Sequence, residues 1–449
     1  MIAPTQPPAI FLVDIDAFFA QAEQILAPEL AGRPVIVGGR VTDRSVVASA
    51  SYEARARGVK TAMPTQEARR ICPDAVFLRG NFHAYARFSD AMMDICRHYT
   101  PLVQPVSLDE AYLDVSDCRR ALEAQGIVHG NAKRGSDPLV RQGSDPFFAS
   151  DAPGATAPAP WPLEVADHLK HAIKRQLGLT VTVGAGTSRL IAKVACDYAK
   201  PSGVAWVHPG REQAFLVPLP LKALPGIGPR TAEHLAQYNL KCIGDLAKIP
   251  PAMLAAHFGP SGEVLAARAR GIDPTPVSGD PSDPKSISRE TTFASNLIDR
   301  DAMKAMLYYL LERTCRQLRD AGLLARTLGI KVRYADFRTE GRSRSLPTFS
   351  DHDDDFWPVA ADLFDKVHTR RVGVRLVGVA LSHFAPSGRQ LDLFVEDRYA
   401  RRTQLYRSID DVRRRFGFSV LATGRAIELL ETHERDANGF RLPTACLSR

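Results

Sequence analysis

Short, predominantly apolar runs alternate with stretches of helical periodicity in the N-terminal part of the chain. The runs are residues 9–13, 34–39 and 181–186, and the second closes with two glycines. Apolar runs of this length are typical of buried strands. Because helical patterns lie between them, this region predicts an α/β or α+β arrangement.

The pattern changes near residue 208. Residues 208–278 predict short helices separated by Gly and Pro, and a Pro-containing linker follows at 279–284. Beyond the linker, the pattern predicts a helix around 301–321 and a strand at 328–334. Alternating apolar and basic residues in that strand predict one buried face and one basic face.

One long segment has neither pattern. Residues 119–162 are rich in Gly, Ser, Asp, Ala and Pro, and Gly-Ser-Asp-Pro occurs at 135–138 and again at 143–146. Two copies of a tetrapeptide are too short for a structural repeat. The composition predicts a disordered surface insertion.

The C-terminal tail contains an amphipathic pattern. Leu405, Ile409, Val412 and Phe416 follow helical spacing beside the basic run 413–415. The sequence leaves two interpretations open: the predicted helix packs on the preceding domain, or its basic run contacts a polyanionic partner.

Charge adds a local signal to this pattern. The 449 residues carry 58 Lys and Arg against 50 Asp and Glu, which gives a formal net charge of +8 and a pI near 9.1. Residues 285–389 hold 18 basic against 13 acidic residues, whereas residues 208–284 hold 7 of each. A basic region after the linker is compatible with a polyanionic partner.

Composition excludes several classes of protein. The hydrophobic share of 45% and the charged share of 24% are those of an ordinary globular chain with room for several domains. No apolar run approaches the roughly 18 residues of a membrane span, and the polar start predicts no secretory signal. The seven cysteines form no CxxC pair and predict reduced thiols. We therefore expect a cytoplasmic protein with no membrane partner.

Acidic residues follow two of the apolar stretches. Asp14-Ile15-Asp16 comes directly after the first strand, and Ser107-Leu108-Asp109-Glu110 follows a second apolar stretch. Carboxylates that meet at strand ends repel one another unless a cation is present. Mg²⁺ prefers such hard oxygen ligands, and two ions would serve an in-line phosphoryl displacement. By spacing alone, solvated surface carboxylates remain the alternative interpretation.

The residues around these acids resemble the motifs of a known family. The matching segments, in chain order, are Val13–Glu23, Ala50–Arg55 with Gly58–Pro64, Ser107–Asp114 and Val183–Gly203. They resemble the Y-family (translesion) DNA polymerases, and most closely their bacterial DNA polymerase IV branch, over roughly residues 10–390.

The resemblance implies an α+β, multidomain right-hand polymerase. The implied domains are the palm (8–17 and 82–207, with the insertion at about 119–162), the fingers (18–81), the helical thumb with a helix-hairpin-helix (208–278), a linker (279–288), the C-terminal α+β little finger (289–388), and a clamp-binding motif with the tail (389–449).

The resemblance also assigns catalytic roles. Asp14, Asp109 and Glu110 would be the catalytic carboxylates and would hold two Mg²⁺ ions, with Glu110 nearest the primer 3′-hydroxyl. Ile15 would contribute only its backbone carbonyl. Phe19 would lie under the incoming sugar as a steric gate, although a core aromatic pair with Phe18 is the alternative. The residues implied to bind the triphosphate of the dNTP are Ser49, Tyr52, Arg55 and Lys200.

Contacts with primer-template DNA are implied in two places. The turn 224–232 resembles a helix-hairpin-helix in which Gly226 and Gly228 approach a phosphate, with a plain turn as the alternative. In the little finger, basic side chains would reach phosphates, with a solvated strand face as the alternative. These side chains are Lys331, Arg333, Arg342 and Arg344.

A short motif near residue 390 implies a protein partner. Gln390, Leu391, Leu393 and Phe394 resemble the peptide by which bacterial polymerases bind the sliding clamp, with ordinary packing as the alternative. The polymerase itself is expected to be a monomer associated with the bacterial nucleoid.

The sequence departs from the family pattern in two places. Thr187-Ser188-Arg189 replaces an expected Asn-Lys-bearing segment, which puts local substrate contacts in doubt, and the 119–162 insertion is unusual for this branch. The leading prediction remains an error-prone, lesion-tolerant, template-directed DNA polymerase. Two alternatives stay open: a non-catalytic scaffold that recruits another polymerase, and a polymerase subunit of an SOS mutagenesis complex. The presence of all three acids argues against the scaffold.

Overall fold

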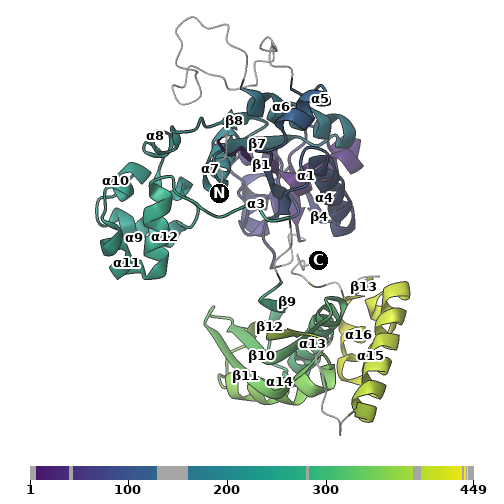
Figure 1. The fold of residues 1–449 in the computed structure, drawn as a ribbon. Helices are drawn as coiled ribbons and strands as arrows, with labels where there is room; N and C mark the ends of the chain where they lie inside the picture. The colour runs from purple at the N-terminus through teal and green to yellow at the C-terminus, as the bar shows by residue number, and fades with distance from the viewer. Residues whose placement is uncertain are drawn as a thin grey trace, which may run out of the picture. The chain divides into compact units, whose positions relative to one another are not determined.

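The computed structural model describes residues 7–39, 44–128, 160–279, 283–387, 396–436, 439, 440 and 442. They divide into two compact units, one formed by residues 1–33 and 81–281 and the other by residues 34–80 and 282–449. Figure 1 labels the helices and strands of both units. Each unit is described by itself.

A five-stranded sheet forms the centre of the first unit. Its strand order is β5 (Val103–Pro105), β6 (Glu110–Asp114), β1 (Ile10–Ile15), β7 (Val181–Gly186) and β8 (Val204–Trp206). All neighbouring pairs are antiparallel except β7 and β8. Every residue of β1 and β7 is buried, which confirms the two strands predicted from their apolar runs.

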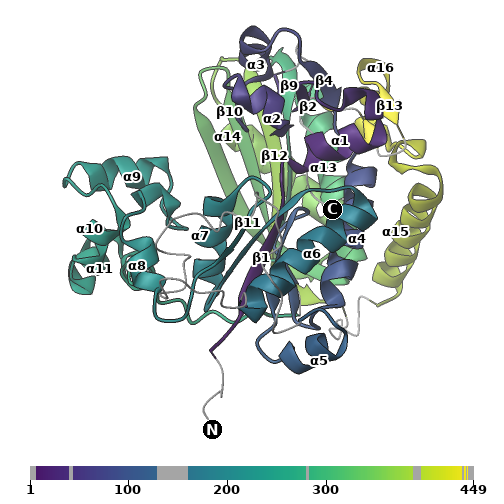
Figure 2. The same cartoon turned by 90° about the horizontal axis from the view of Figure 1, so that it is seen from above.

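Helices cover this sheet. Helices α4 (Phe82–Arg97) and α6 (Trp161–Leu177) lie side by side (Figure 2). Helix α7 (Arg189–Ala199) packs on β1 and β7, where Ala192 and Cys196 contact Ile10 and Leu12. The remaining elements of this part are α1 (Phe18–Leu26), η1 (Pro28–Leu30) and α5 (Arg119–Ala124).

Gly184 allows α7 to approach the sheet closely. A Cβ atom at this position would lie 2.1 Å from the backbone nitrogen of Cys196 and 2.2 Å from the carbonyl oxygen of Ala192. No side chain fits in that space, so any larger residue would push α7 away from β7. The glycine therefore sets how near the polar residues of α7 come to the end of β1.

Short helices make up the rest of the first unit, as the sequence predicts. They are α8 (Glu212–Leu216), η2 (Leu221–Ala223), α9 (Pro229–Ala236), α10 (Ile243–Ala247), α11 (Pro251–Phe258) and α12 (Pro260–Ala269). Three of them begin with proline, which fits the first turn of a helix because its missing N–H has no partner there. Buried Phe215, Leu246 and Leu265 belong to the core that these helices share with α7.

Among its described residues, the second unit contains a three-stranded and a four-stranded sheet, besides a two-stranded one in the tail. The three-stranded sheet, in the order β3 (Ser49–Ala50), β2 (Val35–Gly38) and β4 (Val76–Arg79), accompanies α2 (Tyr52–Ala56) and α3 (Thr65–Ile71). The larger one is antiparallel, in the order β11 (Thr339–Ser350), β10 (Leu323–Tyr334), β12 (Val374–Pro386) and β9 (Ser286–Leu297).

Helices α13 (Arg300–Asp320) and α14 (Asp353–Val367) pack on one face of the larger sheet. Ile330, Val332 and Tyr334 of β10 are buried in that core, while Lys331 and Arg333 point to the other face. The predicted alternation of apolar and basic residues in this strand is therefore confirmed.

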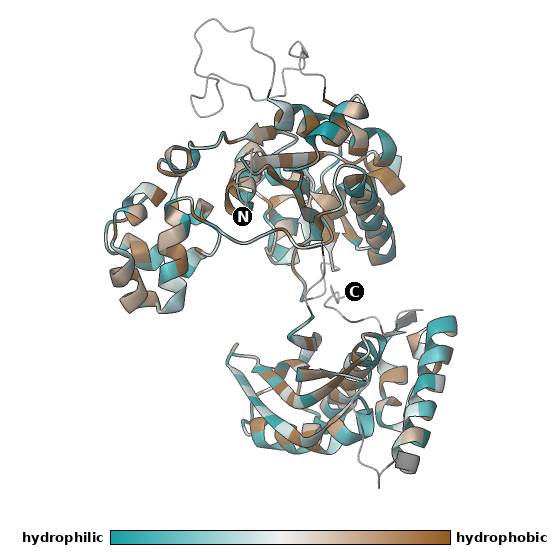
Figure 3. Ribbon diagram, viewed as in Figure 1, coloured by the Kyte–Doolittle hydropathy of each residue, from teal (hydrophilic) through white to brown (hydrophobic). Residues whose placement is uncertain are grey.

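The tail forms α15 (Glu396–Phe416), followed by η3 (Phe418–Val420), η4 (Gly424–Ala426), α16 (Leu429–Thr432), β13 (Arg435–Asp436) and β14 (Gly439–Phe440). The predicted helix exists and packs on the preceding domain, which is one of the two interpretations left open, but three of its four apolar residues are exposed. Leu405, Val412 and Phe416 are 57%, 36% and 68% exposed, whereas Tyr406, Asp410 and Arg413 are buried. Helix α15 is mostly hydrophilic (Figure 3), so it docks on the domain through polar groups.

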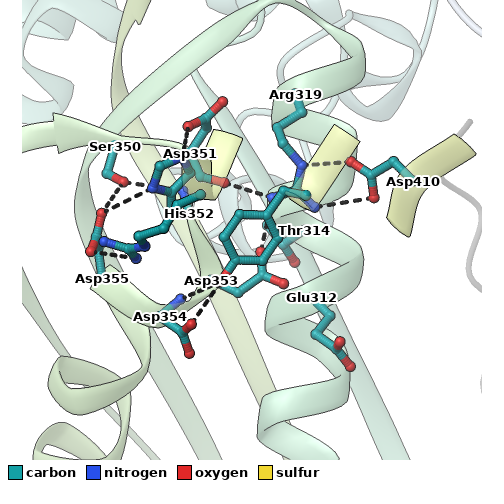
Figure 4. A network of polar contacts seen from close by, with 12 residues as sticks. Glu312, Thr314, Arg319, Ser350, Asp351, His352, Asp353, Asp354, Asp355 and Asp410 are labelled. Atoms are coloured by element: carbon teal, nitrogen blue, oxygen red, sulfur yellow. Dashed lines mark hydrogen bonds and ion pairs between the residues drawn. The ribbon is translucent and has the colours of Figure 1, made fainter. Parts of the chain in front are cut away.

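Ion pairs hold α15 on α13 of the same unit. Arg413 Nη2 lies 2.8 Å from Glu312 Oε1, and Arg319 Nε lies 2.6 Å from Asp410 Oδ2. Arg319 also contacts Asp353 at 2.9 Å. Figure 4 shows this polar network around the start of α14. These charges are buried, so each depends on its partner for stabilisation.

His352 lies inside the same network. Its ring stacks on Tyr399 and Tyr406, with centroids 4.2 and 5.2 Å away, and its Nε2 atom contacts Thr403 Oγ1 at 2.9 Å. Burial lowers the pKa of His352 below its ordinary value, although the nearby Asp351 carboxylate opposes this. The imidazole is therefore neutral in the folded domain at neutral pH.

Acidification is expected to destabilise this domain through His352. The unfolded histidine gains a proton as pH falls through its ordinary pKa of about 6.5, whereas the folded one resists it, so stability is present above that pH and is lost below it. Replacing His352 by Gln removes this titration. When the pH is lowered from 7 to 5, the melting temperature of the variant should rise relative to that of the original protein. A constant difference would contradict the prediction.

Two predicted features lie outside the described residues. They are the larger part of the predicted insertion, residues 129–159, and the motif at 390–394. At the edges of the insertion, α5 and the start of α6 are helical. In the described part of the chain, no helix combines the length and hydrophobicity that a membrane span requires.

Candidate active site

Two of the predicted acidic residues meet on adjacent strands of the first unit. Asp14 of β1 and Glu110 of β6 are direct partners in the antiparallel register. Hydrogen bonding between the two chain segments continues beyond this pair, because Ile15 N donates to Asp109 O at 2.8 Å. The sheet thus brings together residues that are almost a hundred positions apart in sequence.

Two lysines neutralise these carboxylates. Lys193 Nζ lies 2.7 Å from Glu110 Oε2 and 3.8 Å from Asp14 Oδ2. Lys200 Nζ lies 2.7 Å from Asp14 Oδ2. Both ammonium groups also approach Asp197 Oδ1, at 3.5 and 3.7 Å. Cations and carboxylates therefore alternate across the site.

Burial dominates the electrostatics of Asp14. It raises the pKa of this carboxyl to about 6, against the attraction of Lys200 and Lys193, and the charge of Asp109 raises it further. For Lys193, burial alone would lower the pKa, but Glu110, Asp197 and Asp14 together raise it above its ordinary value. The lysine pKa shifts favour charged ammonium groups beside the acids.

The donor set fits a hard divalent cation. Asp14 and Glu110 already converge on one cationic atom, the ammonium nitrogen of Lys193, and carboxylate oxygens are the ligands that Mg²⁺ prefers. The Asp109 carboxylate instead accepts a hydrogen bond from Ser107 Oγ at 2.5 Å. Accordingly, among the residues that the structure describes, no three acidic, His or Cys side chains form a ready-made metal cage.

The sequence interpretation gave no role to three polar residues here. Asp16 is buried and accepts hydrogen bonds from Thr182 Oγ1 at 2.9 Å and from the backbone of Ser202 at 2.8 Å, which holds the turn after Lys200. Lys193 and Asp197 are the other two. They are four residues apart, which places them on one side of α7, and this spacing just before Lys200 could have identified them.

Phe19 belongs to an aromatic cluster. Its ring stacks on Tyr85 at 4.5 Å, and Tyr85 donates a hydrogen bond to Glu23 Oε1 at 2.5 Å. Phe18 is 3% exposed and is a core residue, whereas Phe19 is only half-buried. One ring thus packs in the core, and the other keeps an accessible side while Tyr85 supports it.

The remaining residues implied to bind the triphosphate lie in the second unit. Ser49 is in β3, and Tyr52 and Arg55 are in α2. The Arg55 side chain donates to Ala50 O at 2.9 Å and lies 5.1 Å from the centre of the Tyr52 ring. Tyr52 and Arg55 are therefore held as a pair within their own unit.

The hairpin before α9 has the conformation expected of a close backbone turn. Gly226 has a φ of +101°, which favours glycine, and Arg268 Nη1 donates to Pro225 O at 3.0 Å. Gly228 precedes the first turn of α9, and a Cβ there would meet no atom within 4 Å. The start of α9 is therefore sterically open.

The open face of the larger sheet in the second unit carries a shallow hollow of about 380 Å³. Its lining includes Gly329, Gly341 and Gly378, one from each of three adjacent strands. Lys331 lies beside the hollow and pairs with Glu290 at 2.6 Å. The absence of side chains at the glycines leaves the sheet backbone accessible.

The four basic residues expected to contact DNA do not share one face. Lys331 and Arg333 point away from the helices, and Arg333 Nε donates to Thr339 Oγ1 at 2.9 Å. Arg344 is the register partner of the buried Leu328 and pairs with Asp362 of α14 at 2.5 Å. Arg342, the partner of Ile330, follows the same side of β11 as Arg344.

The departure at 187–189 has a structural role. Ser188 caps α7, because its side chain accepts from Ile191 N. The guanidinium of Arg189 lies 4.5 Å from the centre of the Tyr112 ring on β6. The substituted segment therefore fixes the start of the helix that carries Lys193.

Comparisons with known proteins agree with this architecture. Three family models match: the impB/mucB/samB family at residues 13–197, the C-terminal domain of that family at 284–393, and the thumb domain of DNA polymerase-iota at 222–273. The protein named DNA polymerase IV from Dehalococcoides mccartyi is 36% identical over 418 residues, which are 93% of this chain and 97% of that protein. DNA polymerase IV from Moorella thermoacetica is 37% identical over 94% of this chain and 96% of its own length.

Solved structures give the same result. A Y-family DNA polymerase chimera of Dbh and Dpo4 matches with a TM-score of 0.67 at 25% identity, covering 84% of this chain and 98% of the chimera. The insertion ternary complex of Dbh DNA polymerase matches with a TM-score of 0.53 at 25% identity, covering 84% of this chain and 98% of that chain. The fold is that of a DNA polymerase. The chain belongs to the Y-family of DNA polymerases, and specifically to the impB/mucB/samB family.

Proposed function

We propose that this protein is an error-prone, template-directed DNA polymerase that adds dNTPs to a primer 3′-hydroxyl and bypasses lesions during damage tolerance. The observation that supports the proposal most strongly is the cross-strand pairing of Asp14 with Glu110, beside Asp109, under two lysines. Family membership supports the lesion-tolerant role. The substrates are primer-template DNA and a dNTP.

Asp14, Asp109, Glu110 and the backbone carbonyl of Ile15 would hold two Mg²⁺ ions. When bound, the ions would supply Lewis-acid activation of the primer hydroxyl and neutralise charge on the leaving pyrophosphate. The chain itself orients the reacting groups. Glu110 would hold the ion nearest the primer 3′-hydroxyl, and Lys200, Ser49, Tyr52 and Arg55 would bind the triphosphate through charge-assisted hydrogen bonds.

Phe19 excludes ribonucleotides in this proposal. Its accessible face would lie under the sugar, and its stack on Tyr85 would prevent it from yielding to a 2′-hydroxyl. Replacing Phe19 by Ala should therefore raise ribonucleotide insertion relative to deoxyribonucleotide insertion by about tenfold or more. Single-nucleotide insertion with both sugars measures this ratio. Tyr85→Phe, which keeps the ring, serves as the control, and unchanged sugar discrimination in Phe19→Ala would contradict the gate role.

DNA binding would use the thumb hairpin and the little finger. The backbone at Gly226 and Gly228 and the basic residues Lys331 and Arg333 would contact phosphates without reading sequence. Arg342 and Arg344, which lie on the other side of β11, would contribute from the edge of the sheet. Such binding weakens steeply with salt because counterions are released.

The motif at 390–394 is proposed to bind the sliding clamp, with Leu391, Leu393 and Phe394 as apolar anchors and Gln390 as a polar contact. The polymerase would act as a monomer in the bacterial cytoplasm, near the nucleoid.

The direct test is one-nucleotide extension of a primer-template with Mg²⁺ and the purified chain alone, on undamaged and lesion-containing templates. Extension of both templates is expected. Failure on undamaged DNA would favour a non-catalytic scaffold, and extension only after adding mutagenesis accessory proteins would favour a subunit of an SOS complex.

A further inference from the structure

The two lysines of the active site differ in what surrounds them. Lys200 contacts Asp14 at 2.7 Å, and its proposed partner in the reaction is the triphosphate. Lys193 contacts Glu110 at 2.7 Å and reaches Asp14 at 3.8 Å, so its ammonium group lies where the two cross-strand carboxylates converge. The reaction proposed for this site uses Lys200 and assigns nothing to Lys193.

We propose that Lys193 is an internal counter-cation that occupies the carboxylate site until a divalent ion displaces it. This inference rests on the proposed metal-dependent function. Asp14 and Glu110 are register partners on neighbouring strands, and two such carboxylates repel each other without a cation. The ammonium group supplies that charge, and it competes for the same oxygen atoms that a metal ion would use.

The structure also offers a place for the displaced ammonium group. Asp197 lies one helical turn after Lys193 on α7, and its Oδ1 atom is 3.5 Å from Lys193 Nζ. The Asp197 side chain is 49% exposed, whereas that of Lys193 is 24% exposed. A small rotation of the flexible lysine side chain would therefore move its contact from Glu110 to Asp197 without leaving the protein surface.

This arrangement has a chemical consequence. A resting site that is already neutralised stays folded without metal, and a divalent ion binds it only weakly until the negative triphosphate arrives. Lys193 is thus a positioning residue that makes metal binding depend on nucleotide binding.

The test measures Mn²⁺ binding to the full chain by electron paramagnetic resonance, without DNA or nucleotide. Lys193→Met removes the charge but keeps the stem of the side chain, and it should lower the Mn²⁺ Kd by about tenfold. Lys193→Arg keeps the charge and should bind as weakly as the original protein. Lys174→Met removes a lysine whose Nζ atom donates to Gly178 O and Thr180 Oγ1, away from the acids of the site, and it should change the Kd by less than about twofold.

A double-mutant cycle separates displacement from the general field of the protein. Asp197→Asn should raise the Mn²⁺ Kd by about threefold in the original chain, because Lys193 loses its second partner. The same change should have almost no effect in the Lys193→Met background. Equal effects in both backgrounds would overturn the proposal, because they would show only loss of a distant negative charge.

Thermal melting tests whether the variants are folded. In EDTA, Lys193→Met should melt at a lower temperature than the original protein, and Mg²⁺ should restore most of the difference, since the ion replaces the missing charge. An unchanged Mn²⁺ Kd in Lys193→Met would overturn the inference while leaving the proposed function intact. Both the inference and the proposed function would be refuted if the original chain neither extended primers nor bound Mn²⁺ and Lys193→Met also failed to bind Mn²⁺.

Discussion

Replacing Asp109 or Glu110 by Ala is expected to lower primer extension by about three orders of magnitude or more while the protein stays folded. Both acids are only partly buried, so their removal leaves no large cavity and no buried unpaired charge. Their negative charge is what would hold cations at the primer end, and preorganised charge of this kind commonly contributes more to catalysis than any other effect. Single-turnover extension measures the loss.

The choice of these two acids matters. Asp14 is buried between two lysines, and its removal would take away the nearest carboxylate of Lys200, which would keep only the longer contact with Asp197 at 3.7 Å. Loss of activity in Asp14→Ala would therefore mix folding with catalysis. For Asp109→Ala and Glu110→Ala, an unchanged melting temperature and unchanged DNA affinity are the controls. Primer extension retained by the double Ala variant would refute the catalytic assignment.

Replacing Arg413 by Ala is expected to destabilise the unit that contains α13 and α15 by about 3–5 kcal/mol. The Arg413 and Glu312 side chains are 1% and 2% exposed, so the change leaves a carboxylate in the core without its ion-pair partner. Arg413 also donates to Leu421 O at 2.8 Å and covers the Phe418 ring, and both contacts are lost. The free energy of unfolding from urea titration measures the effect.

The adjacent Arg414 is a matched control. It is 58% exposed and pairs only with surface acids, so Arg414→Ala should change stability by less than about 1 kcal/mol. Burial already raises the pKa of Glu312 to about 7, and loss of Arg413 removes a group that lowers it. The penalty of Arg413→Ala should therefore be smaller at pH 5, where Glu312 is protonated, than at pH 8. A penalty that does not depend on pH would contradict this account.

The sequence predicts the architecture of the chain well where burial is regular. The apolar runs that became β1, β2 and β7, and the alternation in β10, are periodic signals that packing reinforces. Motif resemblance also located the carboxylates of β1 and β6. These features depend on local pattern, which a single sequence records directly.

Other features depend on partners that the local pattern does not show. The apolar positions of α15 do not show which face packs, because Asp410 and Arg413 find buried partners on α13 that lie about a hundred residues earlier. Arg344 stays a predicted DNA contact, but the local pattern gives no sign of its ion pair with Asp362 of α14. Long-range ion pairs are set by tertiary structure and leave little trace in spacing.

The pairing of Asp14 with Glu110 has an implication for variants far from the chemistry. Neighbouring side chains on a strand point to opposite faces, so a slip of one residue between β1 and β6 would turn Glu110 away from Asp14. Substitutions at apolar positions of these strands can therefore inactivate the enzyme by misalignment, with every acid and lysine still present. Screens for inactive variants should recover such positions as often as the charged residues themselves.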